Sequence, residues 1–154
     1  MASKSSHGVS WKKANIRLVQ LNARRARRVL PEIRQKAVEE GADILMLQEP
    51  YQRNGKIEGF GIGTRIVYHN DECPWAALVI LNPEISVLKI SHLCNTHFAV
   101  AELSHRGITF YAVSCYFQLS HDIEKYIRHL DVILESLRGR GLLIGLDSNA
   151  KSPL

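Results

Sequence analysis

The stretch from Leu142 to Ala150 constrains the fold of this chain more than any other. Its first five residues, Leu142 to Leu146, are apolar or glycine, which is typical of a short strand buried on both faces. The run ends in Asp147 and Asn149, with a serine between them. If the backbone stays extended, these two side chains point the same way. A simple turn after the strand is the alternative, because Asp, Ser and Asn are all common in turns.

Length, composition and charge narrow the class of protein. The 154 residues are enough for one domain with a core, and 45% hydrophobic with 23% charged residues is typical of a globular chain. A net charge of +5 and a pI of about 9.3 favour a polyanionic partner, either nucleic acid or an anionic membrane surface. No apolar run reaches the ~20 residues of a membrane span, so we expect no membrane segment.

The cysteines and the N-terminal segment indicate an intracellular protein. Cys73, Cys94 and Cys115 form no CxxC pair, and this odd, scattered set favours reduced thiols over a disulfide framework or a zinc site. Residues 1–14 are predicted to be a flexible basic arm. Met1–Ser10 is too polar for a secretory signal peptide.

The first part of the chain predicts a β–α–β unit. Asn15–Leu21 is a β-rich run, and apolar residues then recur at helical spacing. Because Pro31 fits only within a first turn, this helix is predicted to begin near Val29, and Gly41 ends it. Ala42–Glu49 predicts a second buried strand, in one sheet with the first and parallel or nearly parallel to it.

Polar groups stand where both of these strands end. Asn22 closes the first strand and Glu49 the second, and catalytic groups commonly gather at such carboxyl ends. A helix cap at Asn22 and an exposed rim position for Glu49 are the alternatives. Four arginines follow Asn22 directly, and we expect them to flank the site and contact phosphates, a solvated helix face being the alternative. These are Arg24, Arg25, Arg27 and Arg28.

The middle and end of the chain predict more strands and one more helix. Gln52–Gly63 lacks a GxxxxGK[ST] phosphate loop and is predicted to be a surface loop. An amphipathic helix follows Ser120, its predicted N-cap, and ends at Gly139 or Gly141. Between them, β-like runs separated by turn residues predict an antiparallel meander. The runs are Thr64–Tyr68, Ala76–Leu81, Ile85–Ile90, Phe98–Leu103 and Ile108–Cys115.

Four short segments at strand ends share a pattern when taken together: Gln20–Asn22, Leu47–Tyr51, Ser114–Phe117 and Leu146–Leu154. In this order they resemble the endonuclease/exonuclease/phosphatase family. Within it the chain is most similar to the apurinic-like endonuclease domains of non-LTR retrotransposons, especially insect elements that insert into ribosomal RNA genes. The resemblance implies an α/β fold, a four-layer α/β sandwich of two packed, mainly antiparallel β-sheets flanked by helices. Residues 15–154 would be the N-terminal two-thirds of such a domain, incomplete at the C-terminus.

The resemblance also implies a Mg²⁺-dependent phosphodiester hydrolase, with Mn²⁺ as a possible substitute. Glu49 resembles the principal metal ligand, and Asn22 resembles its neighbour in the metal shell. Asp147 resembles the residue that orients or deprotonates the attacking water. Asn149 resembles the group that supports the phosphate and this aspartate, and Tyr116 resembles the phosphate-contacting tyrosine. Hard oxygen ligands suit Mg²⁺, and donors around a phosphate stabilise its developing charge.

One departure from the family pattern concerns the C-terminal part. Family members carry a further Asp and a late Ser-Asp-His motif, and none of the seven histidines here stands in such a motif. We therefore expect residues 1–154 alone to be nearly inactive.

The function implied by the resemblance is a DNA endonuclease that nicks its target for target-primed reverse transcription. Its partners would be double-stranded DNA, the element RNA and the reverse transcriptase of the parent polyprotein, in the nucleus. An abasic-site repair nuclease or phosphodiesterase of the same fold is one alternative. A non-catalytic nucleic-acid-binding fragment is another. The nuclease hypothesis predicts that the five candidate catalytic residues converge on one pocket.

Overall fold

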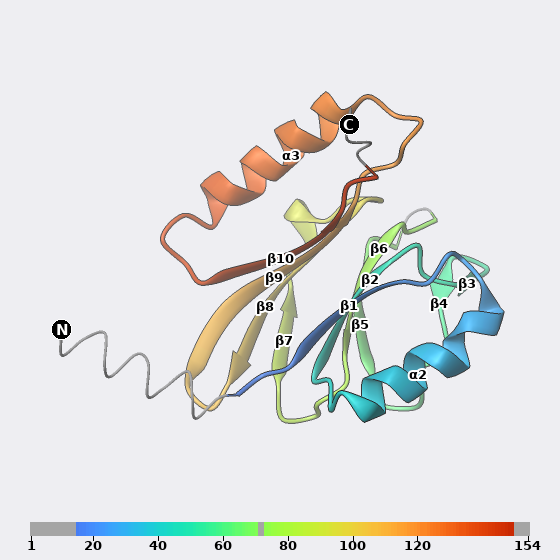
Figure 1. Cartoon of the computed structure of the whole chain (residues 1–154). Coiled ribbons are helices and arrows are strands. Elements are labelled where there is room, and N and C mark those ends of the chain that lie inside the picture. The colour runs from blue at the N-terminus through green and yellow to red at the C-terminus, as the bar shows by residue number, and fades with distance from the viewer. Residues whose placement is uncertain (1–14, 71–72, 150–154) are drawn as a thin grey trace, which may run out of the picture.

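Two β-sheets face each other, and a helix covers the outer side of each (Figure 1). The computed structural model describes residues 15–70 and 73–149, so the predicted arm 1–14 and the segment 150–154 lie outside the described residues. The four layers confirm the predicted α/β sandwich, although each sheet is mixed and contains one parallel pair of strands. The first sheet has the order β1 (Leu18–Asn22), β2 (Ile44–Gln48), β6 (Ala76–Ile80), β5 (Arg65–Val67). The second has the order β10 (Leu142–Asp147), β9 (Ile108–Tyr116), β8 (Phe98–His105), β7 (Ser86–Lys89).

The predicted β–α–β opening is confirmed. β1 and β2 are parallel, and α2 (Leu30–Glu39) connects them after a short 3-10 turn, η1 (Arg27–Val29). Pro31 lies in the first turn of α2, where its missing N–H costs no hydrogen bond. The buried side of α2 packs on β2 through Ile33 and Ala37, so this helix holds the ends of both strands in place.

The predicted single meander is wrong in its topology. β5 and β6 pair with each other, and β6 joins β2 to complete the first sheet. Only β7, β8 and β9 form an antiparallel meander, and it belongs to the second sheet. Between β7 and β8 lies a second 3-10 turn, η2 (Ser91–Leu93). Turn residues mark where a strand ends, but the choice of sheet depends on contacts between distant parts of the chain.

Two local predictions also need correction. The Gln52–Gly63 loop contains a small antiparallel ribbon of β3 (Gln52–Arg53) and β4 (Lys56–Ile57). The helix α3 (Ile123–Ser136) is capped by Asp122 rather than Ser120, since the Asp122 carboxylate accepts a hydrogen bond from the Glu124 N–H. An aspartate is at least as good a cap as a serine, and here it is the better placed of the two.

Strand β10 is less buried than its apolar sequence predicted. Leu143, Ile144 and Leu146 keep 38–40% of their surface exposed. The reason is position: among residues 15–70 and 73–149, β10 pairs only with β9 and forms an edge of the second sheet. Such an uncovered apolar edge favours association with another strand.

Gly145 allows the two sheets to approach closely beneath the strand ends. A Cβ at this position would lie 2.5 Å from Met46 Sδ and 3.0 Å from Met46 Cβ. Gly145→Ala should therefore lower the free energy of unfolding by ~1–3 kcal/mol, as overpacking does in other cores. Urea unfolding followed by tryptophan fluorescence measures this change.

Gly141→Ala is the matched control for that substitution. Gly141 directly precedes β10, and its carbonyl accepts a hydrogen bond from the Tyr111 N–H of β9. A Cβ added at Gly141 would meet nothing closer than 3.6 Å. Equal losses of stability for the two variants would contradict the close-approach explanation.

Candidate active site

Three of the five candidate catalytic residues are joined directly by hydrogen bonds. Asn22 Nδ2 donates to Glu49 Oε1 at 3.0 Å and to Asp147 Oδ2 at 2.8 Å. Asn22 ends β1 of the first sheet and Asp147 ends β10 of the second, so the contact between them joins the two sheets, although the residues are 125 positions apart. Asn149 is the fourth residue of the cluster. Its backbone N–H donates to Asp147 Oδ1 at 3.3 Å, and its side-chain Nδ2 donates to the Phe117 carbonyl at 3.1 Å.

Tyr116 brings the fifth residue into the same cluster. It pairs with Asp147 in the β9–β10 register, and its hydroxyl interacts with the Glu49 carboxylate and the Asn149 amide. Burial raises the pKa of Tyr116 above its ordinary value, and the hydrogen bond to Glu49 raises it further. The hydroxyl therefore stays protonated at neutral pH and can act as a hydrogen-bond donor.

The backbone around this cluster is strained. Glu49 and Asn149 have positive φ angles of 49° and 46°, and Arg24 and Arg25 have 51° and 53°. Residues other than glycine rarely adopt this conformation, and such strain is often found at functional sites. Hydrogen bonds tie the two loops together, since the Arg25 N–H donates to the Glu49 carbonyl at 2.8 Å.

A stack of side chains that sequence analysis missed flanks the cluster. The Arg25 guanidinium lies 3.4 Å from the centre of the Trp75 ring, and Trp75 stacks on Tyr116 with 5.3 Å between ring centres. His97 stacks on Trp75 as well, at 6.2 Å. Burial lowers the pKa of His97 below its ordinary value. Trp75 therefore holds the Tyr116 ring and the Arg25 guanidinium in place. In the sequence, the only feature that pointed to Trp75 was its position directly before β6.

A buried polar bridge beneath the cluster was missed in the same way. Gln48 is 1% exposed, and its Nε2 donates to Ser114 Oγ at 3.1 Å and to the Gly145 carbonyl at 3.3 Å. Ser114 in turn donates to the Leu47 carbonyl at 2.9 Å. These bonds cross from one sheet to the other directly below Glu49 and Asp147. Because a buried amide is costly without hydrogen-bond partners, these bonds favour the observed packing of the two sheets.

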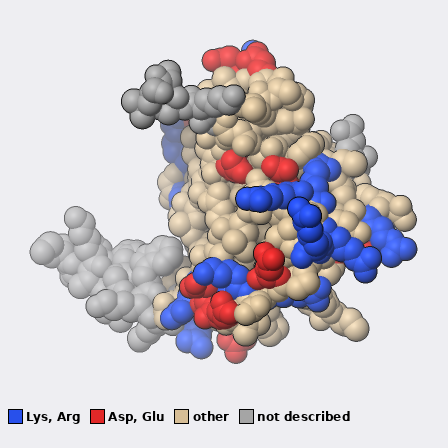
Figure 2. Space-filling model, turned by 45° about the vertical axis from the view of Figure 1, so that its right-hand side comes forward, with Lys and Arg blue, Asp and Glu red and all other residues tan. Residues whose placement is uncertain are grey.

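The four arginines do not have equal surroundings. Arg25 is half-buried, whereas Arg24, Arg27 and Arg28 are exposed. They occupy the turn after β1 and the 3-10 turn η1, next to Asn22, as the sequence predicted. The Arg24 N–H itself donates to Asn22 Oδ1 at 2.8 Å. In Figure 2, Lys and Arg side chains spread over the right-hand part of the face shown, and others lie among Asp and Glu side chains along its lower edge. The right-hand group suits an anionic partner.

The donor set of the cluster fits a hard divalent cation. Glu49 and Asp147 converge on the Asn22 amide. Asn22 and Asp147 line an open hollow of about 450 Å³, together with Gln20, Gln48 and Ser148. Within the described parts of the chain, no three His, Cys, Asp or Glu side chains gather into a ready-made metal cage. Mg²⁺ is commonly held by one or two carboxylates together with waters and a substrate phosphate, so a closed cage is not required. Asn22 Oδ1 has a second lone pair beyond the one that meets Arg24.

Comparisons with known proteins place this fold. No protein-family model matches the chain, and no curated protein matches it in sequence. Among solved structures, the endonuclease domain of TRAS1, a telomere-specific non-LTR retrotransposon, matches with a TM-score of 0.76 and 24% identity over 89% of this chain and 60% of that one.

In residues 15–70 and 73–149, no helix is long and apolar enough to cross a membrane.

Two further structures share the arrangement at lower identity. TDP2 of D. rerio in complex with a single-strand DNA product matches with a TM-score of 0.65 and 11% identity, over 89% of this chain and 62% of that one. The human Nocturnin catalytic domain with a bound sulfate anion matches with a TM-score of 0.58 and 16% identity, over 88% and 65%. The chain thus spans about 60% of the TRAS1 domain. These likenesses show that the chain shares the fold of all three structures.

Proposed function

We propose that residues 15–154 are the N-terminal two-thirds of a Mg²⁺-dependent DNA endonuclease domain of a non-LTR retrotransposon. The domain would nick double-stranded target DNA in the nucleus, and the freed 3′-hydroxyl would prime reverse transcription of the element RNA by the parent polyprotein. The observation that carries the proposal is the hydrogen-bonded cluster of Glu49, Asn22 and Asp147 at three strand ends. The fold shared with the TRAS1 endonuclease domain supports it.

The proposed reaction is hydrolysis of a phosphodiester at this cluster. Asp147 orients a water and accepts its proton while the water oxygen bonds to phosphorus and the bond from phosphorus to the 3′ oxygen breaks. The leaving 3′ oxygen takes up a proton from solvent water to become the free 3′-hydroxyl, and the other product is a 5′-phosphate. Asn149 keeps Asp147 in position, and the protonated Tyr116 donates to a phosphate oxygen. Glu49 and Asn22 would hold Mg²⁺ or Mn²⁺, which neutralises charge on the phosphate when bound.

A plasmid-nicking assay tests this proposal. The enzyme is a polypeptide in which residues 1–154 are followed by the C-terminal part of the domain, and the substrate is supercoiled plasmid. We expect nicked circles with Mg²⁺, none with EDTA, and 3′ ends that a polymerase extends directly. Faster cleavage of an abasic duplex than of an intact one would instead indicate a repair nuclease. Binding of DNA without any metal-dependent cleavage would indicate a non-catalytic fragment.

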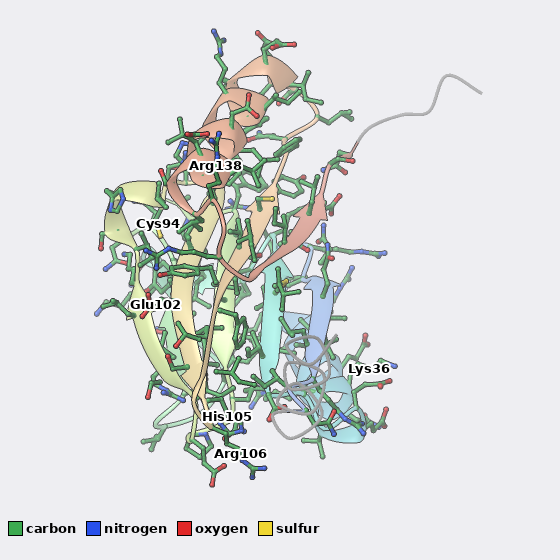
Figure 3. All side chains as sticks on the ribbon, turned by 90° about the vertical axis from the view of Figure 1, so that its left-hand side faces the viewer. Lys36, Cys94, Glu102, His105, Arg106 and Arg138 are labelled. Carbon is green, nitrogen blue, oxygen red and sulfur yellow. The ribbon has the colours of Figure 1, made fainter. Side chains whose placement is uncertain are left out.

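The arginine cluster gives a separate prediction about binding. Arg24→Gln together with Arg25→Gln should weaken duplex binding on every sequence and lower the slope of log K against log salt by about one unit for each lost phosphate contact. Fluorescence anisotropy at several salt concentrations measures both quantities. Arg138→Gln is the control, because Arg138 is an exposed cation at the far end of α3 that pairs with Glu135 (Figure 3). An unchanged salt slope in the double variant would show that these arginines form only a solvated face.

A further inference from the structure

A groove beside α3 opens directly from the candidate active site. Its smaller part, about 200 Å³, reaches Ser148 and Asn149, and its larger part, about 570 Å³, reaches Trp75 and His129. The two parts share Gln118, His121 and Tyr126, so they are continuous. We call this feature the α3 groove. One end of it therefore lies at Asn149, which hydrogen-bonds to Asp147 of the cluster, and Trp75, which stacks on Tyr116, forms part of its wall.

The α3 groove is lined by the cation Lys125 and by three histidines, of which His97 has a pKa that burial lowers. Lys125 and His129 are four residues apart and so lie on one side of α3, and His121 stands just before its first turn. His97 lines the groove from the start of β8. Among residues 15–70 and 73–149, no Asp or Glu lines either part. The Asp122 carboxylate next to His121 is engaged in capping the helix. The groove therefore favours an anionic occupant.

The rest of the lining combines rings and apolar side chains with uncharged polar ones such as Asn95, Thr96 and Gln118. Trp75, His97 and Phe98 line the larger part, and Leu119 and Ile123 line the smaller one, where they are 62% and 44% exposed. Rings beside cations are the usual surroundings of unpaired nucleotides, whose bases stack while their phosphates meet Lys or His. A duplex hides its bases and presents mainly phosphates to such a surface.

We propose that the α3 groove binds a short single-stranded segment of the DNA next to the phosphate that is cleaved. This inference rests on the proposed nuclease function, because the DNA strand that is cleaved at the cluster would continue past Asn149 and along α3 to His129. The segment would be unpaired on leaving the cluster. The groove would then select substrates whose flanking bases are easily opened, and it would hold one strand of the nicked product.

Binding of an unstructured oligonucleotide tests the groove without any cleavage. The probe is fluorescein-labelled dT10, and anisotropy is measured with the chain 1–154 in EDTA. Lys125→Gln with His129→Gln should weaken binding about tenfold at 50 mM salt and lower the salt slope by about 0.7 for each lost phosphate contact. Arg138→Gln, in the turn that follows α3 and outside the groove, should change neither quantity. Circular dichroism and thermal unfolding of both variants verify that α3 stays folded.

The possible results separate this inference from the proposed function. If wild type does not bind dT10, or the groove variant binds it as well as wild type does, the inference is overturned whatever the nicking assay shows. It is also overturned if a blunt duplex of ten base pairs binds as tightly and with the same dependence on Lys125. If dT10 binding depends on the groove but no polypeptide nicks with Mg²⁺, the single-strand site stands and the nuclease proposal fails.

Discussion

Asp147→Asn should lower the rate of plasmid nicking by about 10²–10⁴-fold, the range expected for loss of a general base. The substitution keeps the size of the side chain but removes the carboxylate that Asn22 Nδ2 meets at 2.8 Å and the Asn149 N–H at 3.3 Å. Duplex binding should persist, because the change removes a negative charge near the phosphate. Single-turnover nicking with Mg²⁺ by the longer polypeptide measures the effect.

The matched control is Asp131→Asn, at an exposed position on α3 outside the cluster. It should nick at the wild-type rate. If Asp147→Asn also nicks at that rate, Asp147 is not the group that activates water. The cluster would then have to act through Glu49 alone.

The chain 1–154 by itself should nick at least ~10²–10³-fold more slowly than the longer polypeptide. It contains the metal-side groups and Asp147, but no histidine in a late Ser-Asp-His motif, and loss of one donor to the developing charge typically has an effect of this size. The exposed apolar residues of β10 should add to the loss, because that edge invites association. Parallel nicking assays on supercoiled plasmid, with size-exclusion chromatography of both proteins, measure the two effects.

Similar rates for the two proteins would contradict this expectation. The catalytic donors would then all lie within residues 1–154. Replacing His69, His92, His97 and His105 in turn would identify the one that acts. His97 would be the first to examine, because it stacks on Trp75 beside Tyr116.

Much of the fold could be predicted because its elements carry local patterns. Helical spacing and Pro31 located α2, and apolar runs located β2, β6 and β9. The positions of Asn22, Glu49 and Asp147 at the ends of such runs, together with the resemblance of their segments to a known family, led to the prediction that they would meet. The structure places the three side chains in one hydrogen-bonded group. Their roles in metal binding and catalysis remain predictions.

The tertiary structure decided what no local pattern encodes. The bridge from Gln48 to Ser114 joins residues 66 positions apart, and Trp75 contacts Tyr116 across the two sheets. The division of the predicted meander between two sheets, and the exposure of β10, likewise depend on which distant strand lies alongside. By itself, the sequence determined the elements, their order and the polar groups at their ends, because periodicity and turn preferences act within a few residues. The packing of the two sheets decides which side chains stack, which form the buried bridge and which line the groove. Those contacts join residues that are far apart in the chain, so no local pattern encodes them.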